Sequence, residues 1–208
     1  LYYTHILNLI RDDNPYMRDQ ALTQIMTDVG LQQLLPYFLQ YIIFNMTIHY
    51  HNVDLMINLV NITKCLVKNP SLCSNIYAHT FLKIIFSSLL GADYTSELHG
   101  DDTRLRELSA DVLKLIVDKY QSCFRDMKIC VFNSLIETLF DPNASLMSHY
   151  GALCGIEALD CDAIDYIIPH LNHYLRMMKI EMRSFNPRQR QCAQLICGKV
   201  KQLMTKDL

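Results

Sequence analysis

Histidine and cysteine are the side chains of this sequence best suited to hold a metal ion, but their spacing does not assemble a ligand set. His49 and His51 are separated by one residue near the expected end of a helix, where we expect them to be solvent-exposed polar side chains. His170 and His173 are one turn apart and could share a helical face. Zinc sites usually add closely spaced cysteines or a third nearby ligand, and no Cys-x-x-Cys pair occurs. The sequence therefore predicts no bound metal and no other cofactor.

The remaining short motifs do not indicate a catalytic site. Gly151-x-x-x-Gly155 lacks the Lys and the Ser or Thr that complete a phosphate-binding loop, and no Gly-x-Ser-x-Gly turn occurs. Two glycines one turn apart within a helix instead favour the close approach of a neighbouring helix. Because an enzyme needs convergent reactive groups, we expect that the protein is not an enzyme.

A basic cluster near the C-terminus could attract an anionic partner. Its members are Arg176, Lys179, Arg183, Arg188 and Arg190. The first three share one face of a helix, and Glu181 is the acidic residue among them. The favoured interpretation is a solvated outer face. The alternatives are an acidic protein partner and a weak contact with the DNA backbone.

Composition limits the classes of protein to consider. The chain has 208 residues, half of them hydrophobic, and a formal net charge of −2, which argues against strong nonspecific binding to DNA or anionic membranes. No stretch offers the ~20 apolar residues that span a bilayer, so we expect no membrane contact. The eight cysteines lie mostly within helical patterns and predict reduced thiols in the cytosol or nucleus. The missing initiator Met suggests a fragment of a longer protein.

Helical patterns run along the whole chain, and no segment alternates as a strand would. In the clearest unit, an Asp-Pro-Asn turn at residues 141–143 ends one helix and Ser145 can cap the next. We expect that second helix to bury one apolar stripe, formed by Leu146, Leu153, Ile156 and Leu159. Residues 36–49 are apolar almost all round, which predicts a helix buried between neighbours.

The same helical register recurs along the chain. A polar residue is followed by a small residue at +3 and an apolar residue at +7. Four such sets of three occur: Arg18, Ala21 and Ile25; Arg106, Ser109 and Leu113; His149, Ala152 and Ile156; and Arg190, Ala193 and Cys197. The spacing fits the ~40–47-residue period of paired-helix HEAT or armadillo arrays, with one copy between the first two. We predict an all-α fold, a right-handed α-solenoid of about five HEAT/armadillo-like hairpins. The single domain would cover residues 1–208, with repeats near 1–29, 31–68, 71–120, 124–160 and 162–206.

Several runs resemble the C-terminal HEAT-repeat domain of subunit six of the TBP-associated factors. They are Leu1-Tyr2-Tyr3, the run from Ala21 to Phe38 with its Thr-Asp-x-Gly-Leu and Leu-Leu-Pro elements, Leu66-x-x-Asn69-Pro70-Ser71-Leu72, Leu105-Arg106-x-x-Ser109-Ala110, and His149-Tyr150-Gly151-Ala152-x-x-Gly155. The resemblance covers about residues 1–170. It departs from the family pattern at Val29, where proline is expected, and at His149, where arginine is expected.

The resemblance implies a non-catalytic scaffold of the transcription factor TFIID in RNA polymerase II initiation, shared with a related SAGA-type coactivator. The implied partners are other TBP-associated factors and TFIID subunits, with self-association open. The implied compartment is the nucleus. The family's N-terminal histone fold is absent from this chain. The alternative function is a HEAT or armadillo adaptor in transport or signalling that binds an extended peptide, although the chain has no Trp for such a ladder.

Six residues are the candidates for a partner surface and are expected to be exposed. They are Asp101, Asp102, His149, Tyr150, Arg183 and Arg188. For each of them, a role in a turn, a cap or packing is the favoured interpretation over a contact with a partner. The first two place negative charge at a helix start, where the helix dipole favours it. The sequence does not assign any of them to a particular partner.

Overall fold

The structure is a computed structural model, and it describes residues 2–10, 14–91, 94, 100–159 and 163–206. These residues form ten α-helices and no strand. The helices are α1 (Tyr2–Ile10), α2 (Pro15–Thr27), α3 (Leu35–Ile48), α4 (Val53–Lys68), α5 (Ala78–Leu90), α6 (Gly100–Tyr120), α7 (Met127–Phe140), α8 (Leu146–Ala158), α9 (Ala163–Glu181) and α10 (Pro187–Lys206). Two short 3-10 helices, η1 (Val29–Gln33) and η2 (Asn75–Tyr77), precede α3 and α5. Within this part of the chain, no helix is long and apolar enough to cross a membrane.

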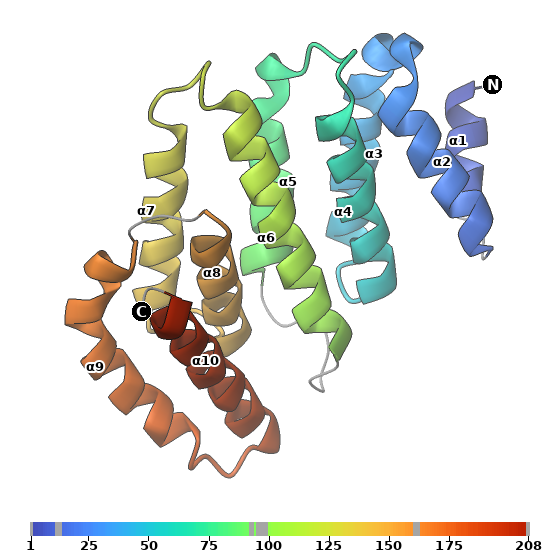
Figure 1. Cartoon of the computed structure of the whole chain (residues 1–208). Coiled ribbons are helices and arrows are strands. Elements are labelled where there is room, and N and C mark those ends of the chain that lie inside the picture. The colour runs from blue at the N-terminus through green and yellow to red at the C-terminus, as the bar shows by residue number, and fades with distance from the viewer. Residues whose placement is uncertain (1, 11–13, 92–93, 95–99, 160–162, 207–208) are drawn as a thin grey trace.

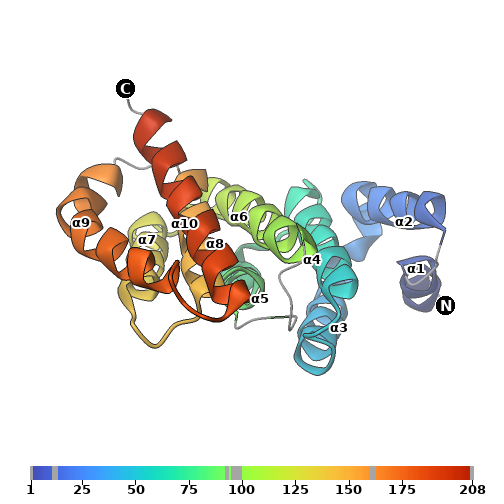
Figure 2. The same cartoon turned by 90° about the horizontal axis from the view of Figure 1, so that it is seen from below.

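Successive helices form hairpins that stack side by side, with the two ends of the chain at opposite ends of the stack (Figure 1). The second helices of the hairpins pack on one another in the order α2, α4, α6, α8 and α10. Seen from below, the first helices lie along the other side of the stack (Figure 2). This arrangement is an all-α solenoid, as the recurring sequence register predicted.

Side-chain caps mark the starts of α2 and α8. Asn14 accepts a hydrogen bond from the backbone N–H of Tyr16 (3.0 Å), and Pro15 occupies the first turn, where a missing N–H has no consequence. Ser145 Oγ accepts a bond from the N–H of Ser148 (3.1 Å) at the start of α8. The predicted cap at Ser145 is therefore confirmed, and Asn14 begins α2 in the same way.

The small residues of the recurring register mark where the second helices approach each other. Ala21, Ser109, Ala152 and Ala193 are all buried. Of the apolar residues four positions later, Ile25, Leu113 and Ile156 are buried, and Cys197 is half-buried. A small side chain lets two helix axes come close, which explains why this position recurs.

Two helices differ from their predicted burial, in opposite directions. Helix α8 buries every residue from Met147 to Ile156, instead of a single stripe, because it packs against α5, α6, α7 and α10. Helix α3 was expected to be buried all round, but Tyr37, Phe44 and Ile48 are exposed. The solenoid offers α3 neighbours on one side, so its remaining apolar residues face outward. Pro169 lies inside α9, which continues through it.

Candidate interaction surfaces

A fully buried arginine ties the end of α5 to α6 and α8. Arg106 Nη1 donates to the carbonyl of Leu89 (2.6 Å), and Nη2 donates to that of Gly91 (3.0 Å). Its Nε pairs with Asp102 Oδ1 one turn earlier on α6 (3.3 Å). From α8, Ser148 Oγ also donates to Gly91 O (3.1 Å). The carbonyls at a helix C-terminus have no partner within the helix, so these bonds satisfy groups that would otherwise be buried unpaired.

Tyr94 closes this site from the side of the α5–α6 connection. Its hydroxyl donates to the carbonyls of Ser87 (2.6 Å) and Ser88 (3.1 Å). Its ring lies 5.1 Å from the guanidinium carbon of Arg106, a cation–π distance. Burial raises the pKa of Tyr94 to about 12, more than the positive charge of Arg106 lowers it. Tyr94 therefore stays protonated and acts as a packing and hydrogen-bonding residue.

The polar residue of the recurring register has the same task in three hairpins. Arg106 reaches the carbonyls at the end of α5, as described above. His149 Nε2 lies 3.0 Å from the carbonyl of Asp141, directly after α7. Arg190 Nη1 donates to the carbonyl of Ser184 (2.9 Å), three residues beyond the end of α9. In these three hairpins, the second helix thus carries a donor that binds a carbonyl at or just beyond the end of the first helix.

Other side chains make similar caps between neighbouring hairpins. Asn69, directly after α4, donates through Nδ2 to the carbonyls of Ile25 (2.8 Å) and Asp28 (2.9 Å) at the end of α2. Lys119 of α6 donates to the carbonyl of Val67 at the end of α4 (2.6 Å). These bonds fix the height of the hairpins of α2, α4 and α6 relative to one another, because they join backbone groups to side chains more than forty residues away.

His149 is held as a neutral imidazole. A carbonyl can only accept, so Nε2–H donates to Asp141 O, and Nδ1 accepts from the hydroxyl of Tyr174 on α9 (3.2 Å). Burial lowers the pKa of His149, and the carbonyl and charge of Asp141 oppose that shift more weakly. The histidine found here in place of the arginine of the family pattern therefore still makes a capping contact.

Two glycines let α8 lie against α5 and α7. A Cβ atom built on Gly151 would stand 1.9 Å from the carbonyl oxygen of Leu89, which no side chain can do. A Cβ on Gly155 would stand 2.9 Å from the side chain of Leu135 on α7. The predicted role of this glycine pair, close packing of a neighbouring helix, is confirmed.

Three of the six candidate residues are buried, which corrects the expectation that they are exposed and agrees with the favoured turn, cap or packing role. Asp102, His149 and Tyr150 are buried, while Asp101 is exposed. The hydroxyl of Tyr150 donates to Glu107 Oε1 (2.8 Å), and burial is the main reason that its pKa is raised. All three sit in turns of α6 and α8 that face other helices, so they hold the stack together rather than form an open surface.

The basic cluster separates into two parts. Arg176 and Lys179 are exposed on α9, as the helical spacing predicted, whereas Arg183 is exposed in the turn just beyond the end of the helix at Glu181. Arg188 is half-buried and lines a cleft, and Arg190 caps the turn after α9. Arg176, Lys179 and Arg183 are thus the basic residues that remain exposed at the C-terminal end of α9 without a capping role.

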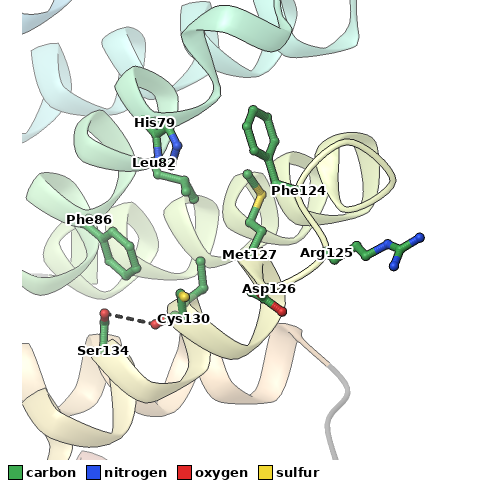
Figure 3. A pocket seen from close by; sticks show the side chains of 10 residues that line it. His79, Leu82, Phe86, Phe124, Arg125, Asp126, Met127, Cys130 and Ser134 are labelled. Atoms are coloured by element: carbon green, nitrogen blue, oxygen red, sulfur yellow. Dashed lines mark hydrogen bonds between the residues drawn. The ribbon is translucent and has the colours of Figure 1, made fainter.

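The first helices leave hollows between them. Between α5 and α7 lies a groove of about 330 Å³, where Leu82 and Phe86 from one helix and Met127 from the other point into the gap, while Arg125 points away (Figure 3). A larger cleft of about 1070 Å³ lies between α7, α9 and the start of α10. Its lining is largely apolar and includes Phe140, Leu146, Met177 and Met178, with Arg188.

The outer face of α3 is the surface that the sequence interpretation missed. Tyr37 is 57% exposed, Phe44 62% and Ile48 53%, and the half-buried Tyr41 lies between them on the same helical face. The fourteen residues of α3 contain no Asp, Glu, Lys or Arg. The absence of charged residues in α3 was visible in the sequence, but we interpreted the apolar residues as evidence that the whole helix is buried. A contiguous apolar patch on a folded surface is typical of an interaction site.

No reactive constellation forms among the side chains that the structure describes. His49 and His51 are exposed, and His51 Nδ1 lies 2.9 Å from the carbonyl of Tyr94. No group of three or more His, Cys, Asp or Glu in that part of the chain could hold a metal ion. The side chains of His170 and His173 lie outside it, so the expectation for that pair stays a prediction.

The sequence matches the family described as the TAF6 C-terminal HEAT repeat domain over residues 1–172. Among curated relatives, Transcription initiation factor TFIID subunit 6 of Arabidopsis thaliana is 26% identical over 186 residues, 88% of this chain and 34% of the relative. The SAGA complex/transcription factor TFIID complex subunit Taf6 of Schizosaccharomyces pombe is 28% identical over 180 residues, 84% of this chain and 39% of the relative. The chain thus spans about a third of the length of these curated relatives.

A solved structure supports the fold. The TAF6 C-terminal domain from Antonospora locustae superposes with a TM-score of 0.71 at 24% identity, covering 95% of this chain and 94% of that one. At this identity the likeness shows the architecture alone. The family match, in contrast, covers most of the sequence and includes the capping residues Asn69, Arg106 and His149. The chain therefore belongs to the family of TAF6 C-terminal HEAT repeat domains.

Proposed function

We propose that the protein is a non-catalytic interaction scaffold of the general transcription factor TFIID, acting in RNA polymerase II initiation in the nucleus. Its curated relatives carry the names of TFIID subunits, and the relative in Schizosaccharomyces pombe is also named for the SAGA complex. A role in a SAGA-type coactivator therefore belongs to the same proposal. The partners would be other TBP-associated factors and TFIID subunits.

The observation that carries this proposal is the uncharged apolar face of α3. A rigid helical stack gains nothing from exposing Tyr37, Phe44 and Ile48 to water, because burying apolar area stabilises a protein by about 25 cal/mol per Å². A partner that covers this face would recover that free energy. The capping bonds between hairpins keep the face in a fixed position, as a scaffold requires.

The test is reconstitution of the chain with individually purified TFIID subunits, measured by co-elution in size-exclusion chromatography. We expect at least one subunit to co-elute with the wild-type chain. The double variant Tyr37→Gln, Phe44→Gln should reduce this binding at least about tenfold, because truncating buried aromatic residues at an interface commonly costs 2 kcal/mol or more.

The matched control is Ile129→Gln on α7, a residue that is 61% exposed and far from α3 in the sequence. It should leave co-elution unchanged. If no subunit co-elutes with the wild-type chain, although circular dichroism shows an intact helical fold, the scaffold function within TFIID is wrong. If the α3 variant binds as well as wild type, the scaffold uses another face.

A further inference from the structure

The outer face of α9 combines positive charge with exposed apolar side chains. Arg176 and Lys179 are exposed there, together with Ile180 (63% exposed) and Met177 (46% exposed), which also lines the edge of the large cleft. Arg183 is exposed in the turn that directly follows the last residue of α9, Glu181. At 3.6 residues per turn, the order around the helix is Lys179, Arg176, Ile180 and Met177, an arc of about 160°. We call these four residues and Arg183 the α9 basic–apolar face. Phe185, in the turn that follows, is fully exposed.

This charge is available to a partner. Residues 176–190 contain five basic residues and one acidic residue, in a chain whose formal net charge is −2. The ion pairs of Arg106 with Asp102 and of Lys199 with Glu157 do not involve the α9 basic–apolar face. The other two arginines of the basic cluster do not belong to this face. Arg188 is half-buried, and Arg190 caps the turn after α9.

We propose that the α9 basic–apolar face binds an acidic amphipathic helix of another protein, with carboxylates against Arg176, Lys179 and Arg183 and apolar side chains against Ile180 and Met177. The positive charge of the face favours a partner with an acidic edge, and the neighbouring exposed Ile and Met favour an apolar edge beside it. Met adapts its shape to irregular apolar partners. The inference rests on the proposed scaffold function and names a partner class for a second surface.

A protein helix fits this face better than nucleic acid does. Duplex DNA presents phosphates, which would contact the three basic residues and leave Ile180 and Met177 exposed. The acidic net charge of the remaining chain also opposes a long polyanion. In addition, the face lies beyond residue 172, where the family match ends, so the family alone does not account for it.

The first step of the test is selection on the whole chain from a phage-displayed library of random 16-residue peptides. Peptides that compete with one another and contain Asp or Glu beside apolar residues at i, i+3 and i+4 are expected. The selected peptide, labelled with a fluorophore, and a 20-base-pair DNA duplex are then compared by fluorescence anisotropy in the same buffer.

Matched variants locate the binding site. The double variant Arg176→Glu, Arg183→Glu should weaken peptide binding at least about tenfold, whereas Arg104→Glu on α6, also exposed, should change it less than about twofold. Ile180→Ser should weaken binding about three- to tenfold. Ile129→Ser, which alters an isoleucine of equal exposure on α7, should have no effect. Circular dichroism checks that each variant keeps its helical content.

Three results would overturn the inference. Selection could enrich peptides without acidic residues, or the control variants could weaken binding as much as the α9 variants do. Alternatively, the DNA duplex could bind at least as tightly as the peptide, with no loss in Ile180→Ser, which would identify a phosphate-binding face. Because selection uses the chain alone, these results do not depend on co-elution with TFIID subunits.

Discussion

At the scale of residues, hydrogen bonds explain why a polar residue recurs at one position of the second helices. Arg106, His149 and Arg190 each place a donor against carbonyls that follow the first helix of their own hairpin. A buried carbonyl without a partner costs about 1–3 kcal/mol, and this cost applies most clearly to the fully buried bond from Arg106 to Leu89. Both arginine and histidine meet this need, since the task requires an N–H at the right height rather than a charge.

Arg106 should be among the most sensitive positions of the protein. Replacing it by Ala leaves Asp102 buried without its cation and removes donors from the carbonyls of Leu89 and Gly91. We expect Arg106→Ala to lower the free energy of unfolding by about 3–5 kcal/mol, measured by urea denaturation. The exposed neighbour Arg104→Ala should change it by less than about 0.5 kcal/mol. A loss below 1 kcal/mol at Arg106 would contradict this account.

His149 should make stability depend on pH. Its folded pKa lies below the ordinary value of about 6.5, so between the two values the unfolded chain binds more protons than the folded one. The free energy of unfolding should therefore fall as pH drops from about 7.5 through 6.5 and level off below the folded pKa.

The variant His149→Gln isolates this effect, because Gln can still donate to the Asp141 carbonyl but does not titrate. Urea denaturation at several pH values should give a shallower slope for the variant than for wild type. Equal slopes would show that His149 titrates alike in the folded and unfolded chains.

At the scale of elements, α8 and α3 show that the number of apolar residues does not set the burial of a helix. Helix α8 contains Ser148, Gly151 and Gly155, yet helices enclose it on all sides because these small residues allow close approach. Helix α3 is richer in large apolar residues and keeps one face exposed. Burial follows the number of neighbours that the stack provides.

The glycines of two second helices provide a matched test of this packing. Gly151→Ala would drive a methyl group into the backbone of α5, so we expect a loss of about 1–3 kcal/mol or more in the free energy of unfolding. Gly198 on α10 has open space around its Cβ position. Gly198→Ala should therefore stabilise the protein by up to about 1 kcal/mol through helix propensity. Urea denaturation of both variants should give changes of opposite sign, and equal signs would refute the close approach of α8 to α5.

At the scale of the whole molecule, each hairpin is covered by its neighbours and by side chains that cap its helix ends. Stability in such stacks is approximately the sum of hairpin and interface contributions. Caps such as Asn69 and Lys119, which join adjacent hairpins, strengthen the interfaces, so we expect the described stack to open as a unit rather than hairpin by hairpin.

Cysteine labelling can measure this cooperativity. Cys73, Cys123 and Cys130 are exposed, whereas Cys154 and Cys192 are buried, and burial raises the pKa of Cys154 to about 12. With iodoacetamide under native conditions, the exposed thiols should react at least about a hundredfold faster than the buried ones, because only the accessible thiolate reacts. Peptide mapping by mass spectrometry gives the rates. Fast labelling of Cys192 alone would show that α10 opens independently.

Local sequence determined the helices and their order. Proline, the Asn14 and Ser145 caps and the apolar spacing fix where helices begin, since they act within a few residues. The recurrence of small residues such as Ala21, Ser109 and Ala152 likewise revealed the stacked hairpins. The exposure of Arg176 and Lys179 on α9 followed from helical spacing, because the charged side chains of a surface helix turn toward water.

The tertiary structure alone decided which polar side chains are enclosed and which apolar ones are not. The sequence suggested that Asp102, His149 and Tyr150 lie on the surface. In the structure, Asp102 pairs with Arg106 one turn away, and His149 and Tyr150 find their partners on other helices. Phe44 read as core because it is apolar, yet no helix of the described chain covers it. Burial depends on the arrangement of neighbouring helices, and that arrangement is a property of the folded stack rather than of any single segment.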